Sequence, residues 1–300
     1  MKIKPFAVEE WMNAYETQAK YNIAETCVYS VSMNELFSLC GVDQQAFLSE
    51  FTARRLTYGD ITGAASFKEG VCRLYKTLTP DELVTTHGAA GANHHVFYSL
   101  VEPGDRVISI MPTYQQLYSI PESFGADTHI MHLKEENGYL PDLDELRALA
   151  GLRLGWIATH DRDLLASLLS HRDYNHISCG MFDEALASVA LSHSDTLLRH
   201  NRQIVRENLA ILDDWVKSEP RIHYHKPQAG TTALVYYEYD LDSYSFCKRL
   251  LDETGAFVTP GDCFEEPKSM RIGYANDRQD LIDGLNAVSK LLQPLEAEGK

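Results

Sequence analysis

Between residues 83 and 132 the sequence alternates short apolar segments with turns and helical segments. This alternation limits the possible folds more than any other feature. The expected strands are residues 83–86, 107–110 and 128–132, and helices are expected over 92–100 and after Pro112-Thr113-Tyr114. Such alternation is typical of an α/β fold in which helices cover a parallel sheet.

The rest of the chain divides into a helical beginning and an alternating end. Helices are predicted over 8–20, 33–40, 44–51, 65–76 and, as one long stretch, 180–217; strands over 232–237, 257–259 and 270–274, with helices over 243–254 and 280–292. We expect the beginning and the end to pack together as a smaller domain. The predicted limits are 1–55 and 216–300 for its two parts, with 56–215 as the large domain.

One join in the large domain departs from the alternation. A helical segment at 142–149 runs directly into the apolar strand 151–158. Elements of this kind are normally separated by a connecting loop. The join at 149–151 is therefore unusual for two elements of this kind.

Composition excludes several classes of function. The chain has 27 basic and 43 acidic residues, a net charge of −16, and no long run of lysine or arginine. A nucleic-acid partner is therefore not expected. No apolar stretch has the length of a membrane-spanning helix, and the first ten residues do not form a signal core. We expect a cytoplasmic protein without a membrane partner.

The cysteines and histidines give no metal-binding pattern. The six cysteines are scattered without a Cys-x-x-Cys pair, so reduced thiols are expected rather than a zinc site or a disulfide framework. His87, His94 and His95 lie close in sequence, but no third ligand follows at helical spacing. A structural or pocket-lining role is the prediction for these histidines, and no metal is expected.

A turn of small residues, Gly88-Ala89-Ala90, joins the strand 83–86 to the next helix. The free backbone N–H groups at the start of a helix, together with its dipole, favour phosphate. The Gly-x-Gly-x-x-Gly pattern of dinucleotide sites is absent. A close strand-to-helix connection also requires small residues, so the turn alone leaves both interpretations open.

Several motifs in one order resemble the aspartate aminotransferase family, fold type I of the pyridoxal-phosphate enzymes. They are Thr86-His87-Gly88-Ala89-Ala90-Gly91-Ala92-Asn93, Glu102-Pro103-Gly104-Asp105, Pro112-Thr113-Tyr114, Gly151-Leu152-Arg153-Leu154-Gly155-Trp156, Ala229-Gly230-Thr231, Val258-Thr259-Pro260-Gly261 and Met270-Arg271-Ile272-Gly273-Tyr274. The resemblance implies a three-layer α/β/α large domain with a small α+β domain. It also implies pyridoxal 5′-phosphate as cofactor, and an amino acid and a 2-oxo acid as substrates.

The resemblance also assigns roles to individual residues. It places the cofactor phosphate at Gly88, Ala89, Ala90 and Arg153, the cofactor ring against Tyr114, and the substrate α-carboxylate on Arg271. Tyr58 would reach the phosphate of a neighbouring subunit, which implies a homodimer. Arginine suits the two anionic groups because its planar fork binds them through two hydrogen bonds. The simpler alternatives are a surface ion pair for Arg153, a core aromatic for Tyr114 and an edge-strand charge for Arg271.

The family's Schiff-base lysine has no counterpart here. In the family it lies in a segment of several dozen residues that is missing at the 149–151 join. The aspartate that pairs with the ring nitrogen and the central strands of the sheet belong to the same segment. Lys68, Lys76 and Lys134 lie in segments that do not match. Because the lysine is both covalent anchor and general base, we expect negligible turnover.

Three functions remain open. The first is a pyridoxal-phosphate-dependent aminotransferase, or an internally deleted and inactive form of one. The second is a lyase on the same scaffold, because a shared fold does not fix the reaction. The third is a non-catalytic module that keeps the fold for binding.

Overall fold

The computed structural model describes residues 3–55, 57–133 and 155–297. The predicted helix 142–149, the join at 149–151 and Arg153 lie outside the described residues. The helices are α1 (Ala7–Tyr15), α2 (Met33–Cys40), α3 (Gln44–Thr52), α4 (Ala65–Cys72), α5 (Gly88–Leu100), α6 (Gln116–Phe124), α7 (Arg162–Arg172), α8 (Met181–Ser192), α9 (Ser194–Ser218), α10 (Ser243–Thr254) and α11 (Arg278–Ala297).

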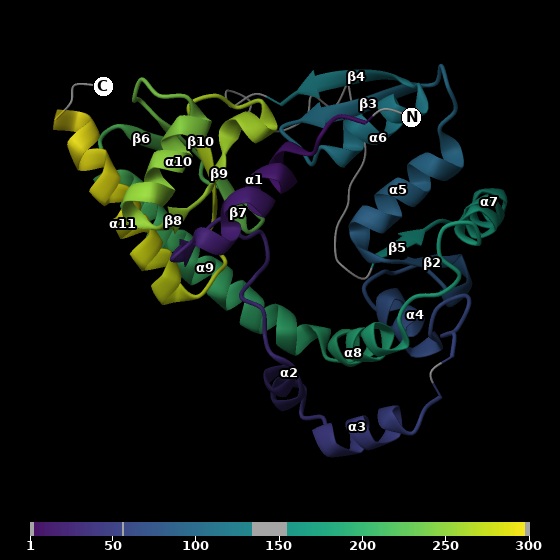
Figure 1. Cartoon of the computed structure of the whole chain (residues 1–300). Coiled ribbons are helices and arrows are strands. Elements are labelled where there is room, and N and C mark those ends of the chain that lie inside the picture. The colour runs from purple at the N-terminus through teal and green to yellow at the C-terminus, as the bar shows by residue number, and fades with distance from the viewer. Residues whose placement is uncertain (1–2, 56, 134–154, 298–300) are drawn as a thin grey trace.

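The strands are β1 (Tyr21–Asn22), β2 (Leu83–Thr86), β3 (Arg106–Met111), β4 (Asp127–His132), β5 (Gly155–Ala158), β6 (Ile222–Tyr224), β7 (Thr232–Tyr237), β8 (Ala256–Phe257), β9 (Thr259–Pro260) and β10 (Ser269–Gly273). Short 3₁₀ helices are η1 (Glu16–Gln18), η2 (Pro80–Glu82) and η4 (Gly261–Phe264). Figure 1 shows their arrangement.

Local sequence signals explain where some helices begin and end. The Asp242 side chain accepts a hydrogen bond from the N–H of Ser245 at the start of α10, and Gly255 ends this helix with a φ of 79°. The predicted helix 243–254 is confirmed. The prediction of one helix over 180–217 is wrong, because His193 leaves helical geometry at ψ 26° and separates α8 from α9.

The small domain is built around an antiparallel sheet with the strand order β6-β7-β10-β9. Its core contains fully buried residues from β7, α10, β8 and β10, among them Val235, Leu250, Phe257 and Ile272. The beginning of the chain joins this core: β1 pairs with β8, and Nε1 of Trp11 donates to the Val258 carbonyl over 3.0 Å. Val8, Trp11, Ile23 and Ala24 therefore belong to the small-domain core.

The large-domain strands form two separate pairs. β3 and β4 are parallel, as predicted, whereas β2 and β5 are antiparallel. An apolar run such as 155–158 reads alike in both directions, so its pattern does not fix strand direction. No described strand bridges the two pairs. This agrees with the expectation that they flank the missing central strands. Two-stranded sheets are marginal alone, so each pair depends on its helices, with α5 contacting both β5 and α6.

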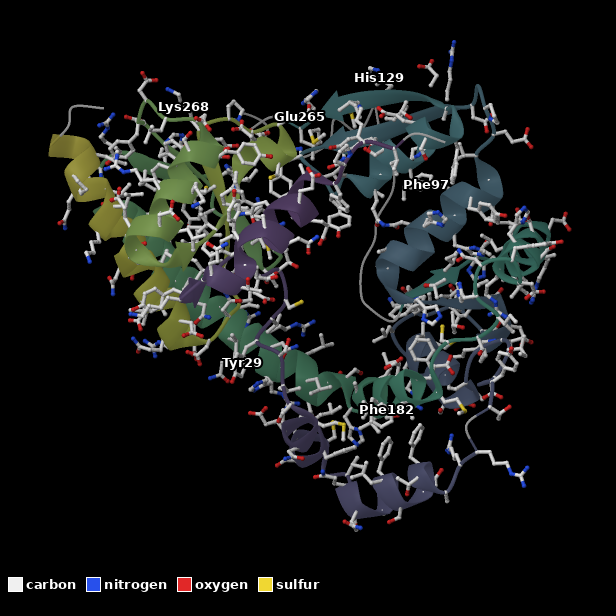
Figure 2. The ribbon with its side chains drawn as sticks, in the orientation of Figure 1. Tyr29, Phe97, His129, Phe182, Glu265 and Lys268 are labelled. Atoms are coloured by element: carbon white, nitrogen blue, oxygen red, sulfur yellow. The ribbon has the colours of Figure 1, made fainter. Side chains whose placement is uncertain are left out.

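The lower part of the molecule in Figure 1 consists of helices that connect the two domains. The long α9 leads from the small domain to α8, and α2 contacts both of these helices. Phe47 and Phe51 of α3 pack edge-on against Phe182 of α8, with ring centroids 6.4 and 4.9 Å away (Figure 2). The domain limits 1–55, 56–215 and 216–300 stay a prediction. Within the described parts of the chain, no helix has the length and apolar character needed to span a membrane.

Candidate active site

A pocket of about 440 Å³ lies between the turn after β3 and the small-domain strands β7 and β10. Residues from both domains line it, among them Thr113, Tyr114, His225, Gln228, Phe264 and Arg271. Two side chains with predicted roles, Tyr114 and Arg271, therefore share one pocket although they are far apart in sequence.

Arg271 is the charged group of this pocket. Its Nη2 donates to the Ala24 carbonyl over 3.0 Å and to Oγ1 of Thr259 over 3.1 Å. Its guanidinium lies over the Phe264 ring, 5.1 Å from the centroid. The Nε atom is buried and has no hydrogen-bond partner among the described residues. Burial lowers the pKa of Arg271, but an arginine stays charged in proteins. A carboxylate in the pocket would satisfy this charge and the free donor.

Tyr114 forms another wall of the pocket and is partly exposed. Its hydroxyl donates to Oε1 of Glu9 over 3.1 Å, and its ring meets Phe6 edge-on at 4.7 Å. The next residue, Gln115, makes two further contacts with the start of the chain. Its side-chain amide donates to the Pro5 carbonyl and accepts from the N–H of Ala7. Stacking of Tyr114 on a cofactor ring stays a prediction.

The turn Gly88-Ala89-Ala90 begins α5, as the phosphate prediction requires. Gly88 has a φ of 69°, a conformation that glycine adopts without strain. No side chain caps this helix start, so its first N–H groups remain available to a ligand. However, the turn does not contribute to the pocket of Tyr114 and Arg271. The residues predicted to bind the phosphate and the residue predicted to bind the carboxylate thus do not line the same pocket.

Tyr58 lies apart from both. It is 69% exposed and lines a separate pocket of about 240 Å³ with Gly59, Asp60 and Glu184. Glu184 is buried, and burial raises its pKa. A role for Tyr58 in a neighbouring subunit stays a prediction.

Three residues near the pocket were not predicted from the sequence. Glu9 lies in an ordinary amphipathic helix, which gives no signal for a site. His225 and Gln228 lie in the polar segment just before the motif Ala229-Gly230-Thr231. Their position next to this family motif is the sequence signal that could have predicted them.

A comparison with protein families gives one match, "Aminotransferase class I and II", over residues 44–149 and 147–287. The chain belongs to this family. The match is divided into two segments that meet at the join near 149–151, where the sequence indicates a deletion.

Individual relatives agree with this assignment. The chain is 26% identical to capreomycidine synthase of Streptomyces vinaceus over 366 aligned positions, which cover 95% of this chain and 93% of that protein. Because the alignment is longer than the chain, dozens of positions of that relative face gaps here.

Solved structures resemble the whole described fold. A pyridoxal-phosphate-dependent aminotransferase from Streptococcus suis is 33% identical, with a TM-score of 0.93 and coverage of 98% of this chain and 99% of that chain. The pyridoxal-phosphate-dependent cyclase OrfR is 19% identical, with a TM-score of 0.83 and coverage of 98% of both chains. The predicted recognition as a fold type I aminotransferase is confirmed.

The described residues fit pyridoxal phosphate in part. The uncapped start of α5 suits a phosphate, and Tyr114 and Arg271 suit a ring and a carboxylate. No lysine lines the pocket within the described ranges. Lys68 is buried on α4, where burial lowers its pKa, and Lys134 lies outside the described residues. The residues present therefore fit reversible binding rather than covalent anchoring.

Proposed function

We propose that this member of the aminotransferase family binds an α-amino acid or 2-oxo acid in the Arg271 pocket and holds pyridoxal phosphate reversibly, without turnover. The observation that carries the proposal is Arg271, a charged side chain that lines the pocket and whose buried Nε has no hydrogen-bond partner among the described residues. A desolvated cation of this kind is costly unless an anion pairs with it.

Neighbouring residues hold the guanidinium group of Arg271 in one orientation. Two acceptors, the Ala24 carbonyl and the Thr259 hydroxyl, hold Nη2, and Phe264 covers the guanidinium face. The described contacts of the guanidinium are thus two neutral acceptors and one ring, so its charge is left for an anionic ligand, and a carboxylate forms strong charge-assisted hydrogen bonds with arginine. The α-carboxylate common to amino acids and 2-oxo acids meets this requirement.

The family resemblance assigns the two ends of the cofactor to this chain's own groups, although the phosphate turn does not line the Tyr114 pocket. The first N–H groups of α5, from Gly88 to Ala90, would donate to its phosphate, and Tyr114 would cover its ring. When bound, pyridoxal phosphate supplies an electron sink for chemistry at the substrate α-carbon. The chain lacks the lysine that would anchor it and move the α-proton.

We also propose that the chain forms a homodimer. The exposed Tyr58 is not used by its own subunit's Arg271 pocket, which leaves it available to a neighbouring copy. Its Tyr-Gly-Asp turn carries the resemblance to the family's shared site.

A second candidate for the chemistry of a full-length form is cyclisation or elimination. Capreomycidine synthase and the cyclase OrfR are among the similar proteins. Product analysis of a full-length form with amino-acid substrates separates this candidate from transamination, because only transamination transfers nitrogen to a 2-oxo acid.

Calorimetric titration with 2-oxoglutarate tests the carboxylate site. We expect Arg271→Lys to bind it at least about tenfold more weakly than the unchanged chain, because a hydrogen bond between charged groups contributes about 1.5–3 kcal/mol. The control is Arg278→Lys, an exposed arginine outside the pocket, with circular dichroism to verify folding. Equal affinity in Arg271→Lys would refute the proposal.

A further inference from the structure

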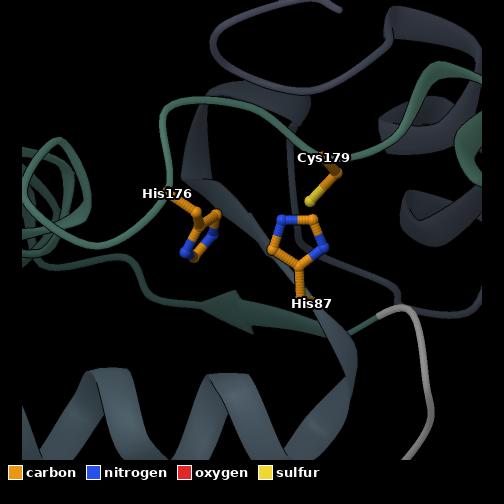
Figure 3. Close-up of side chains that lie close together, drawn as sticks. All are labelled: His87, His176 and Cys179. Carbon is orange, nitrogen blue, oxygen red and sulfur yellow. The ribbon is translucent and has the colours of Figure 1, made fainter.

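A cluster of three potential metal ligands lies outside the Arg271 pocket (Figure 3). His87 comes from the junction of β2 and α5, and His176 and Cys179 come from the segment between α7 and α8. One ligand atom from each residue lies within 4.8 Å of the other two. The imidazole rings of His87 and His176 have centroids 4.8 Å apart. No disulfide or ion pair accounts for this convergence among the described residues.

Each of the three side chains offers one possible ligand atom to a metal. Nε2 of His176 lies 3.3 Å from the Thr85 carbonyl, and a proton shared with that carbonyl leaves the other ring nitrogen with a free lone pair. Burial lowers the pKa of His176, which favours the neutral, metal-binding imidazole. Cys179 is a free, buried thiol, and His87 is exposed and free to adjust.

The other histidines nearby are used differently. His95 is buried and its Nε2 lies 2.8 Å from the Leu168 carbonyl, whereas His94 stacks on Tyr98 of the same helix. The three nitrogen and sulfur ligands therefore stand out as a group. The sequence analysis named His87 beside His94 and His95 and expected no metal, because His176 and Cys179 are distant from His87 in the sequence.

We propose that His87, His176 and Cys179 form a zinc site with a fourth position open to water or an anion. Two imidazoles and one thiolate are a donor set that zinc prefers. Zinc bonds are about 2.0 Å to nitrogen and about 2.3 Å to sulfur, so the bound atoms must lie within roughly 4 Å of one another. The ligand atoms, now within 4.8 Å, must therefore draw closer on binding, and His87 is the exposed side chain of the three. On binding, the Cys179 thiol releases its proton to solvent as the zinc–sulfur bond forms.

The site connects two parts of the large domain. His87 immediately precedes the phosphate turn Gly88-Ala89-Ala90, and Cys179 immediately precedes Gly180, the residue before α8. Zinc would fasten the start of α5 to the α7–α8 segment, and an anion at its open position would lie beside the phosphate turn. The zinc site is independent of Arg271, so either proposal can fail without the other.

Cobalt titration of the reduced chain tests this site, because Co²⁺ bound to a thiolate shows a sulfur-to-metal charge-transfer band. We expect one Co²⁺ per chain with this band, displaced by Zn²⁺. Cys179→Ser should abolish the band, and His87→Ala should weaken binding at least about tenfold, a loss typical of altered metal shells. Because His87 is exposed, its alanine variant is expected to keep the fold.

Cys27→Ser and His94→Ala are the matched controls, since both residues are exposed and lie outside the cluster. Both should bind like the unchanged chain. The proposal is overturned if Co²⁺ binds without the charge-transfer band. It is also overturned if the band survives in Cys179→Ser, or if His87→Ala and His94→Ala have equal effects.

Discussion

The hydroxyl of Tyr114 donates a hydrogen bond to Oε1 of Glu9, 3.1 Å away, and so links the first helix of the chain to the wall of the Arg271 pocket. Gln115 strengthens this link through the Pro5 carbonyl, 2.7 Å away, and the N–H of Ala7, 2.9 Å away. The small-domain helix α1 and the large-domain turn after β3 are thereby held together at the site. The charge of Glu9 also acts on Arg271.

Glu9→Gln should bind a carboxylate ligand more tightly. The substitution keeps an acceptor for Tyr114 but removes the negative charge that competes for Arg271. Because exposed charge pairs contribute at most about 1 kcal/mol, we expect the dissociation constant for 2-oxoglutarate to fall about two- to fivefold. The control is Glu10→Gln, whose side chain lines a different pocket. Weaker binding by Glu9→Gln, measured calorimetrically, would contradict this account.

Trp11→Ala should destabilise the small domain strongly. The indole is buried, lies parallel to the Phe257 ring at 6.0 Å and donates to the Val258 carbonyl. Removing a buried tryptophan costs about 3–5 kcal/mol in the free energy of unfolding. Urea denaturation measures this loss, with Tyr29→Ala as the control because its side chain is exposed. A loss of less than 1 kcal/mol would show that α1 is not part of the core.

Glu82 should make stability depend on acid pH. Hydrogen bonds from His160 and Thr79 lower the pKa of Glu82 from its usual 4.5 to about 2. Its contribution is present in full above pH 4.5 and is lost as the pH falls toward 2. Glu82→Gln should therefore unfold at a lower temperature than the unchanged chain at pH 7, and the difference should shrink by pH 2. Glu69→Gln, an exposed site on α4, should show no such trend. A constant difference across this range would contradict the assignment.

Sedimentation tests the proposed homodimer. At micromolar concentration we expect a dimer, and Tyr58→Ala should weaken the binding of pyridoxal phosphate when dimer is present. Because Tyr58 is exposed, the alanine variant is expected to keep the fold. A chain that sediments only as a monomer would rule out the shared site.

The parts of the fold that carry local signals could be predicted from the sequence. Asp242 and Gly255 mark the ends of α10, and the motif around Arg271 placed that residue in the small-domain sheet before its pocket was known. The break at His193 was missed because no glycine or proline marks it. The direction of β5 could not be predicted, because an apolar run reads alike in both directions.

Only some of the residues that form the two sites could be predicted from the sequence. Tyr114 and Arg271 share a pocket as the family resemblance suggests, but Glu9 reaches them from the opposite end of the chain. The group of His87, His176 and Cys179 is assembled by the path of the chain between α7 and α8. Neither helical nor strand spacing connects these three residues, so only the folded arrangement reveals them.

This chain keeps the aminotransferase fold and a carboxylate pocket, and we expect it to lack turnover. Purified chain is mixed with pyridoxal phosphate, 2-oxoglutarate and a panel of amino acids, and the formation of new oxo acid is followed, with a full-length family member as positive control. General acid–base assistance contributes about 10² to 10⁴ in rate, and this chain has lost that group together with its covalent role. We predict no turnover above the protein-free rate. Turnover at about 1 per second or faster, an ordinary enzyme rate, would show that another lysine of this chain does the work and would contradict the account.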